Sequence, residues 1–200
     1  MEMALKLASI FFTMILVDNY VLAKFLGICP FLGVSKKLDS AVGMSLAVTF
    51  VMVLATAATW PIYKLVLEPF GMAYLQTIAF ILIIAILVQL LENVLKKYIP
   101  TLYKSLGVYL PLITTNCTIL GVTILNLDNG YDFVESIVCA AGAGIGFLVA
   151  MVLFSGVRRR VEEANVPKSF EGLPITLVAA AMVSLSFMGF GGIVEAIFGV

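Results

Sequence analysis

Residues 26–34 read Leu-Gly-Ile-Cys-Pro-Phe-Leu-Gly-Val, and a weaker copy returns at residues 115–122 as Thr-Asn-Cys-Thr-Ile-Leu-Gly-Val. Both contain Cys-x-x-Leu-Gly-Val, which gives Cys29 and Cys117 equivalent positions. Each copy sets a thiol and helix-weakening residues inside an apolar segment, where a membrane-spanning chain favours an unbroken helix. The repetition predicts that the two stretches are halves of one site.

Composition predicts an integral membrane protein. Of the 200 residues, 62% are hydrophobic and 12% are charged, against ~25% charged residues in an ordinary soluble domain. The 12 Lys and Arg residues balance the 12 Asp and Glu residues, so we expect no nucleic-acid partner. The chain contains no histidine, which excludes histidine metal sites, Ser-His-Asp triads and histidine proton relays.

Six apolar segments are long enough to cross a ~30 Å hydrocarbon layer, which takes ~20 helical residues. They cover residues 4–31, 41–63, 74–95, 103–125, 133–157 and 173–198. The connections between them are short, so we expect a single membrane domain over residues 1–200. The N-terminus lacks the basic region and cleavage site of a signal peptide, and we expect its first segment to be retained as a span.

Basic residues sort to one side of the membrane when the six segments alternate in direction. Lys6 and Lys64 fall on one side, and Lys24 lies within the first segment. The other side holds the remaining nine, which are Lys36, Lys37, Lys96, Lys97, Lys104, Arg158, Arg159, Arg160 and Lys168. The positive-inside rule places these nine in the cytoplasm. Both termini are therefore expected on the non-cytoplasmic side.

The first segment is predicted to be a broken helix. Residues 4–34 would form a helix of ~46 Å at ~1.5 Å per residue, against a ~30 Å core. The obvious places for a break are Asp18-Asn19 and residues 27–33. In the second of these, Pro30 lacks a backbone donor and the glycines weaken the helix.

The fourth segment carries a matching interruption, at Pro111 and the polar residues 114–116. The two halves of the chain, about 1–98 and about 99–200, contain three spans each, so the second half must cross the membrane in the opposite sense. We therefore expect an all-α fold of two inverted three-helix repeats with broken first and fourth helices. Such breaks at matching positions indicate a site near the membrane midplane.

Two interpretations of the paired cysteines are open on this evidence. Cysteine behaves as a small hydrophobic residue in a membrane core, whereas repeated thiols at helix breaks suit iron–sulfur ligation. A [2Fe–2S] centre normally takes four cysteine ligands, so Cys29 and Cys117 would supply half a site and a partner the rest. Cys139 has no counterpart in the first half and lies beside the small residues 140–144, which favours a packing role.

Polar residues inside membrane spans are costly and indicate function. Asp18 and Asn19 are candidates for contact with an ion or proton. Asn116 is a candidate hydrogen-bond donor that tunes the neighbouring thiolate. The glycine-rich residues 142–146 follow no predicted strand, so we interpret them as a helix-packing surface rather than a nucleotide loop.

Residues 24–37 and 110–117 resemble the A-type membrane subunits of Rnf complexes, the ion-translocating ferredoxin:NAD oxidoreductases of bacterial membranes. The similarity runs essentially end to end, including residues 49–52, 77–82 and 186–190. The E-type subunit of sodium-pumping NADH:quinone reductase is a related protein. Residue 18 departs from the family pattern, because members often carry Asn where this chain has Asp18.

The resemblance implies a multi-pass subunit of the bacterial cytoplasmic membrane that pairs with a homologous E-type subunit. Each member of the pair would contribute two cysteines to a shared [2Fe–2S] cluster, and the ligands in this chain would be Cys29 and Cys117. The expected function is electron transfer within a redox-driven Na⁺ or H⁺ pump, with no catalysis by this chain alone. The rival functions are a secondary transporter and a structural anchor for redox subunits.

Overall fold

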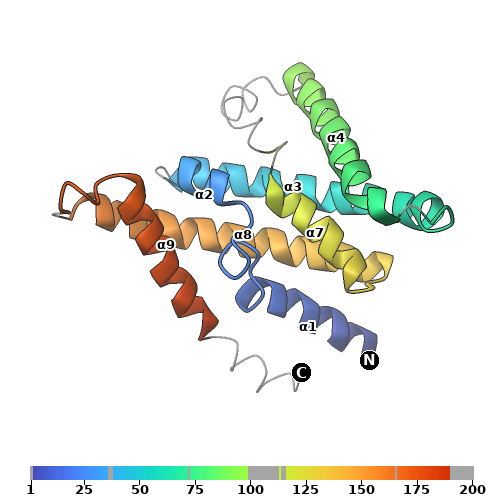
Figure 1. Ribbon diagram of the computed structural model, residues 1–200, viewed down its shortest axis with the longest axis horizontal. Helices are drawn as coiled ribbons and strands as arrows, with labels where there is room; N and C mark the ends of the chain where they lie inside the picture. Colours follow the sequence, from blue (N-terminus) through green and yellow to red (C-terminus); the bar gives the residue numbers. More distant parts are fainter. Residues whose placement is uncertain are drawn as a thin grey trace.

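The computed structural model describes residues 2–35, 38–71, 73–98, 113, 116–164 and 166–189, and every regular element within these ranges is helical (Figure 1). The α-helices are α1 (Glu2–Leu16), α2 (Ile28–Val34), α3 (Leu38–Ile62), α4 (Gln76–Tyr98), α7 (Cys117–Asp128), α8 (Phe133–Glu162) and α9 (Leu173–Met188). A π-helical turn, η1 (Tyr63–Leu67), follows α3, and a 3₁₀ turn, η2 (Ala73–Leu75), precedes α4.

The centre of the fold is the pair formed by α3 and α8, which lie side by side and run in opposite directions (Figure 1). Helix α1 packs on α8 and helix α7 packs on α3. The large side chains Met44 and Met52 of α3 and Phe147 and Phe154 of α8 are completely buried. Helices α4 and α9 leave this pair at its opposite ends (Figure 1).

Small residues let α1 and α3 approach α8 closely. A Cβ atom on Gly144 would lie 2.4 Å from Cγ2 of Thr49 in α3, and one on Gly146 would lie 2.9 Å from the carbonyl oxygen of Met14 in α1. Because only a hydrogen atom fits at these two positions, the glycines set the distance between the helices. The interpretation of residues 142–146 as a packing surface is confirmed.

Helix α3 changes its winding at its C-terminal end. Pro61 lies in its last turn, and η1 follows directly. Proline has no N–H group for the helical ladder, and a wider π turn is a common accommodation where that ladder is interrupted. Together α3 and η1 form one apolar helix of 30 residues, Leu38–Leu67.

Three helices within the described ranges are long and apolar enough to cross a membrane, Leu38–Leu67, Gln76–Val94 and Phe133–Glu162. They fall in the second, third and fifth predicted segments. The other three predicted segments contain the shorter apolar helices Leu5–Leu16, Cys117–Asp128 and Leu173–Met188. The all-α class is therefore confirmed for the described part of the chain, while the six-span inverted repeat stays a prediction.

The first segment is broken at the first of its two predicted places, Asp18-Asn19, and not across the second, residues 27–33. Residues 17–27 are irregular, and they include Asp18, Asn19 and Gly27. Residues 28–33 belong to α2, so a break across them was the wrong expectation. Pro30 lies in the first turn of α2, where no intrahelical donor is needed. In the fourth segment, α7 begins directly after Asn116, and Pro111 lies outside the described residues.

Candidate functional site

Asn19 ties the irregular segment to the core of the fold. Its side chain is buried, with Nδ2 donating to the carbonyl oxygen of Gly146 at 2.8 Å and Oδ1 accepting from the N–H of Val21 at 3.1 Å. The second bond forms an Asx-type turn that stabilises a chain reversal. Asp18 lies beside it, half-buried. Asn19 thus links the irregular segment to α8 and also fixes the backbone of that segment.

Gly27 is the point at which the two cysteine motifs meet. It is the N-cap of α2 with φ of 81°, a left-handed conformation that favours glycine. Its backbone N–H donates to Sγ of Cys117 at 2.9 Å, across 90 residues of sequence. A Cβ atom here would lie 2.2 Å from Oγ1 of Thr118. The position therefore requires glycine both for its conformation and for the contact.

The start of α7 forms the other side of this contact. Asn116 is buried and caps the helix, since its Oδ1 accepts from the N–H of Thr118 at 3.0 Å. Cys117 follows as the first residue of the helix, where the unpaired N–H groups and the helix dipole favour negative charge. Local sequence accounts for this start, because asparagine is among the best N-cap residues.

A second contact between the two motifs joins Leu26 to Gly121 of α7. A Cβ atom on Gly121, one turn further along α7, would lie 2.5 Å from Cδ1 of Leu26. Leu26 precedes Gly27 in the first motif, and Gly121 belongs to the Leu-Gly pair of the second. A junction between the two motifs is therefore present in the structure, while their role as halves of one site stays a prediction. Its contacts are made by the residues around the cysteines as well as by one thiol.

The three thiols differ in exposure. Cys29, in the first turn of α2, and Cys117 are both exposed, whereas Cys139 is buried. The Sγ atom of Cys139 lies 4.0 Å from the hydroxyl of Tyr20 in the core. Its surroundings are those of a packing residue, as predicted. The two motif thiols remain accessible to a group bound from outside this chain.

Two polar atoms beside the thiols are buried without a hydrogen-bond partner in the described part of the chain. They are Nδ2 of Asn116 and Oγ1 of Thr118. A buried polar group without a partner is destabilising by roughly 1–3 kcal/mol. The two atoms belong to the residues on either side of Cys117 in the sequence.

The described residues include no cluster of three or more Cys, Asp or Glu side chains placed to hold a metal ion. Cys29 and Cys117 can therefore serve as part of a ligand set, and a centre with four thiolates needs the remainder from another chain. The two thiols, the N–H of Gly27 and the two unpartnered atoms nevertheless suit a thiolate-ligated cluster, because hydrogen bonds to sulfur are a recurring feature of such sites.

Sequence reasoning missed Arg158, which holds the far end of α2. Its side chain is 9% exposed, and Nη1 donates to the carbonyl oxygen of Leu32 and to Oγ of Ser35, the latter at 2.8 Å. Its Nε donates to Oε1 of Glu162 at 3.2 Å. In the sequence it is one of three consecutive arginines, and only its position on α8 distinguishes it from the exposed Arg159.

Thr118 and the N–H of Gly27 were also missed as parts of the site. Thr118 directly follows Cys117, at the position that Pro30 occupies in the first motif. Comparison of the two copies could therefore have identified Thr118, since its hydroxyl stands where the first copy has Pro30, which has no side-chain polar atom. Gly27 has no such signal, because its role depends on a backbone contact with the distant Cys117.

A family model described as "Rnf-Nqr subunit, membrane protein" matches residues 7–194. The A-type subunit of the Na(+)-translocating ferredoxin:NAD(+) oxidoreductase complex of Acetobacterium woodii is 55% identical over 188 residues, which cover 94% of this chain and 98% of that protein. The A-type subunit of the ion-translocating oxidoreductase complex of Syntrophotalea carbinolica is 56% identical over 180 residues, covering 90% and 93%. Its counterpart in Aliivibrio fischeri is 51% identical over 181 residues, covering 90% and 94%. The chain belongs to the Rnf–Nqr family of membrane subunits, as the resemblance predicted.

Proposed function

We propose that this chain is a membrane electron-transfer subunit of an Rnf-type ion-translocating ferredoxin:NAD oxidoreductase complex, in which Cys29 and Cys117 supply half the ligands of a [2Fe–2S] cluster. Relatives that match nearly all of the chain are named as subunits of such complexes. The observation that carries the site assignment is the hydrogen bond from the N–H of Gly27 to Sγ of Cys117. It joins the two cysteine motifs at one place.

The chemistry that the cluster supplies when bound is one-electron transfer. The residues of this chain would hold it and tune it. The N–H of Gly27 stabilises negative charge on the Cys117 sulfur, and such hydrogen bonds raise the reduction potential of thiolate-ligated centres. Asn116 directly precedes Cys117 and its Nδ2 is buried without a partner in the described part of the chain, so we propose it as a second donor to this sulfur. This retains the donor role that the sequence predicted for Asn116.

The remaining ligands would come from a homologous E-type subunit. Cys29 and Cys117 are exposed residues in the first turns of α2 and α7, where a partner can approach both. Two such chains bring four thiols together, the usual number for a [2Fe–2S] centre. This requirement explains why the chain is no enzyme by itself.

We further propose that the chain crosses the membrane six times as two inverted repeats. Figure 1 supports this arrangement, since α3 and α8 are antiparallel and α4 and α9 leave opposite ends of that pair. Each of these helices then has its counterpart in the other half of the chain, as α2 has in α7. Both termini would lie on the non-cytoplasmic side of the bacterial cytoplasmic membrane.

The coupling to Na⁺ or H⁺ movement would act through the contact between the two motifs. A change of charge at the thiolates alters the hydrogen bond from Gly27 and the capping of α7, which biases the relative position of the two halves. Asp18 is the group proposed to meet the ion, because its carboxylate is half-buried in the irregular segment. Asn19 would fix the backbone around it.

The test measures iron, acid-labile sulfide and the reducible [2Fe–2S] signal of the complex purified with Cys29→Ala, Cys117→Ala or Cys139→Ala. We expect the first two to lose the signal and the cluster iron, and Cys139→Ala to retain both. An unchanged signal in Cys29→Ala or Cys117→Ala contradicts the assignment. Full electron transfer without both thiols would indicate a structural anchor. Solute transport by iron-free protein would indicate a secondary transporter.

A further inference from the structure

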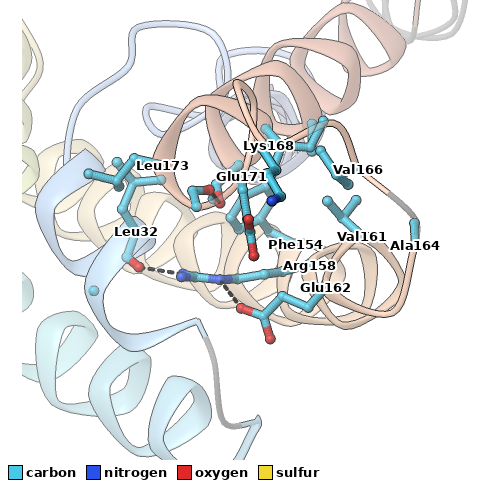
Figure 2. Close-up of a pocket in the computed structure, with 15 residues that line it drawn as sticks. Leu32, Phe154, Arg158, Val161, Glu162, Ala164, Val166, Lys168, Glu171 and Leu173 are labelled. Atoms are coloured by element: carbon cyan, nitrogen blue, oxygen red, sulfur yellow. Dashed lines mark hydrogen bonds and ion pairs between the residues drawn. The ribbon is translucent and has the colours of Figure 1, made fainter.

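A cavity of about 700 Å³, the α8–α9 cavity, lies between the end of α8, the C-terminal part of α2 and the start of α9 (Figure 2). Its volume lies within the ~300–1,000 Å³ range of small-molecule sites. Phe154 of α8 and Ile175 of α9 contribute apolar walls. Its charged lining consists of Arg158, Glu162, Lys168 and Glu171. The cavity therefore combines an apolar interior with two cations and two anions.

Two of the four charged side chains pair with each other, and the other two are open to a ligand. Arg158 donates to Glu162 and to α2. Lys168 and Glu171 are exposed and form no ion pair within the described ranges. Figure 2 shows their side chains reaching into the cavity from the segment before α9. A cation and an anion that are both available to a ligand thus face the same space.

An apolar crevice continues from this cavity between α2 and α9. It has a volume of about 50 Å³ and is lined by Phe31 and Leu32 on one side and by Leu177 and Ala180 on the other. Leu32 lines both spaces, whereas α9 contributes different residues to each: Thr176 and Ala179 line the cavity, and Leu177 and Ala180 line the crevice. The α8–α9 cavity therefore opens toward a narrow apolar path along α9.

The charged end of this path lies at headgroup depth. Arg158 belongs to the last turns of the candidate span Phe133–Glu162, and the clustered arginines there mark the cytoplasmic interface by the positive-inside rule. A phospholipid at that depth presents its phosphate to the interface and its acyl chains to the hydrocarbon layer. The order of polar cavity and apolar crevice matches that of a lipid molecule.

We propose that the α8–α9 cavity binds the headgroup of a zwitterionic phospholipid with a primary ammonium group, phosphatidylethanolamine. Lys168 pairs with its phosphate, Glu171 pairs with its ammonium, and a few methylene groups of one acyl chain enter the crevice between α2 and α9, with the rest of that chain lying along the outside of α9. An anionic lipid without an ammonium group leaves Glu171 facing negative charge. Lys168 and Glu171 together therefore favour the zwitterionic lipid over the anionic one.

The test uses the full-length chain, purified with the subunits that accompany it, in nanodiscs of equal phosphatidylethanolamine and phosphatidylglycerol. Either lipid carries a photoactivatable diazirine in one acyl chain, and mass spectrometry locates the cross-links. We expect phosphatidylethanolamine to label the peptide containing Leu177 and Ala180 about fivefold more than phosphatidylglycerol, since one interfacial charge contributes about that factor. Equal labelling by the two lipids overturns the proposal.

Charge variants separate this site from a general surface effect. Glu171→Lys is expected to reverse the lipid preference, and Glu171→Gln to abolish it without favouring phosphatidylglycerol. Glu163→Lys is the matched control, because Glu163 is also exposed at the end of α8 but lies outside the cavity lining. An equal shift in Glu163→Lys contradicts the proposal. Absence of cross-links on α9 in the wild type also contradicts it and indicates a protein segment in the cavity.

Discussion

The backbone N–H of Gly27 donates a hydrogen bond to Sγ of Cys117 at a distance of 2.9 Å. The two residues belong to the two copies of one motif, and each lies at the start of a helix. A backbone donor cannot be moved without moving the chain that carries it. The contact therefore couples the position of α2 to the state of the thiol on α7.

Gly27→Ala should weaken this junction. The added methyl group would meet Oγ1 of Thr118 at 2.2 Å, in a backbone conformation that L-residues rarely adopt. Backbone strain and overpacking each cost about 1–3 kcal/mol, so we expect unfolding to become easier by at least about 2 kcal/mol. Thermal unfolding in detergent, followed by circular dichroism, measures the change.

Gly33→Ala is the control for that experiment. Gly33 lies in α2, has no heavy atom within 4 Å of an added Cβ, and is outside the positive-φ positions. Alanine is the better helix former by about 1 kcal/mol, so this variant should be neutral or slightly more stable. Equal loss of stability in both variants would refute the role assigned to the Gly27 contact.

Gly144→Ala should separate α8 from α3. Its Cβ would lie within 2.4–2.8 Å of three side-chain atoms of Thr49, which is itself held by a hydrogen bond to the carbonyl oxygen of Ser45. Overpacking of this kind costs about 1–3 kcal/mol. Gly156→Ala, in the same helix with open space around its Cβ, should retain wild-type stability. A lower thermal midpoint for Gly144→Ala than for Gly156→Ala would show that the loss of stability comes from the close approach of α3 at Gly144.

Arg158→Met should release the end of α2. It leaves the carbonyl oxygen of Leu32 and the hydroxyl of Ser35 without their donor in a largely buried place. Loss of such partners costs about 1–3 kcal/mol for each group, which predicts faster proteolysis at the C-terminal end of α2. Arg159→Met removes an exposed ion pair instead, and we expect a change of less than about 0.5 kcal/mol. Similar proteolysis of the two variants would contradict the anchoring role.

The orientation of the chain can be tested with single cysteines at two exposed positions. Ser169→Cys lies before α9 on the side that the positive-inside rule places in the cytoplasm, and Asp128→Cys lies at the end of α7 on the opposite side. In intact cells, a membrane-impermeant maleimide should label Asp128→Cys, whereas Ser169→Cys should react only after the cells are opened. The opposite result would reverse the proposed topology, and wild-type protein reports the background from native thiols.

Several features of the fold could be predicted because they depend on local chemistry. Low charge and long apolar segments predict membrane helices, which satisfy their own backbone groups. The excess length of the first segment predicted its interruption near Asp18 and Asn19. Asn116, the last residue of the polar run predicted to interrupt the fourth segment, caps α7, which begins at Cys117; residues 114 and 115 lie outside the described residues. Proline misled the prediction at residue 30, because the first turn of a helix tolerates it.

Composition, repetition and residue properties within a few turns are enough to predict the helical class, the paired cysteine motif and the interruption of the first segment. Three contacts could be known only from the folded chain: Gly27 donates to Cys117, Asn19 donates to the backbone of Gly146, and Arg158 rather than Arg159 is buried against α2. Each of these contacts joins segments far apart in the chain. Their partners depend on how closely α1, α2 and α7 pack around α3 and α8, and the small residues at those helix surfaces set that packing.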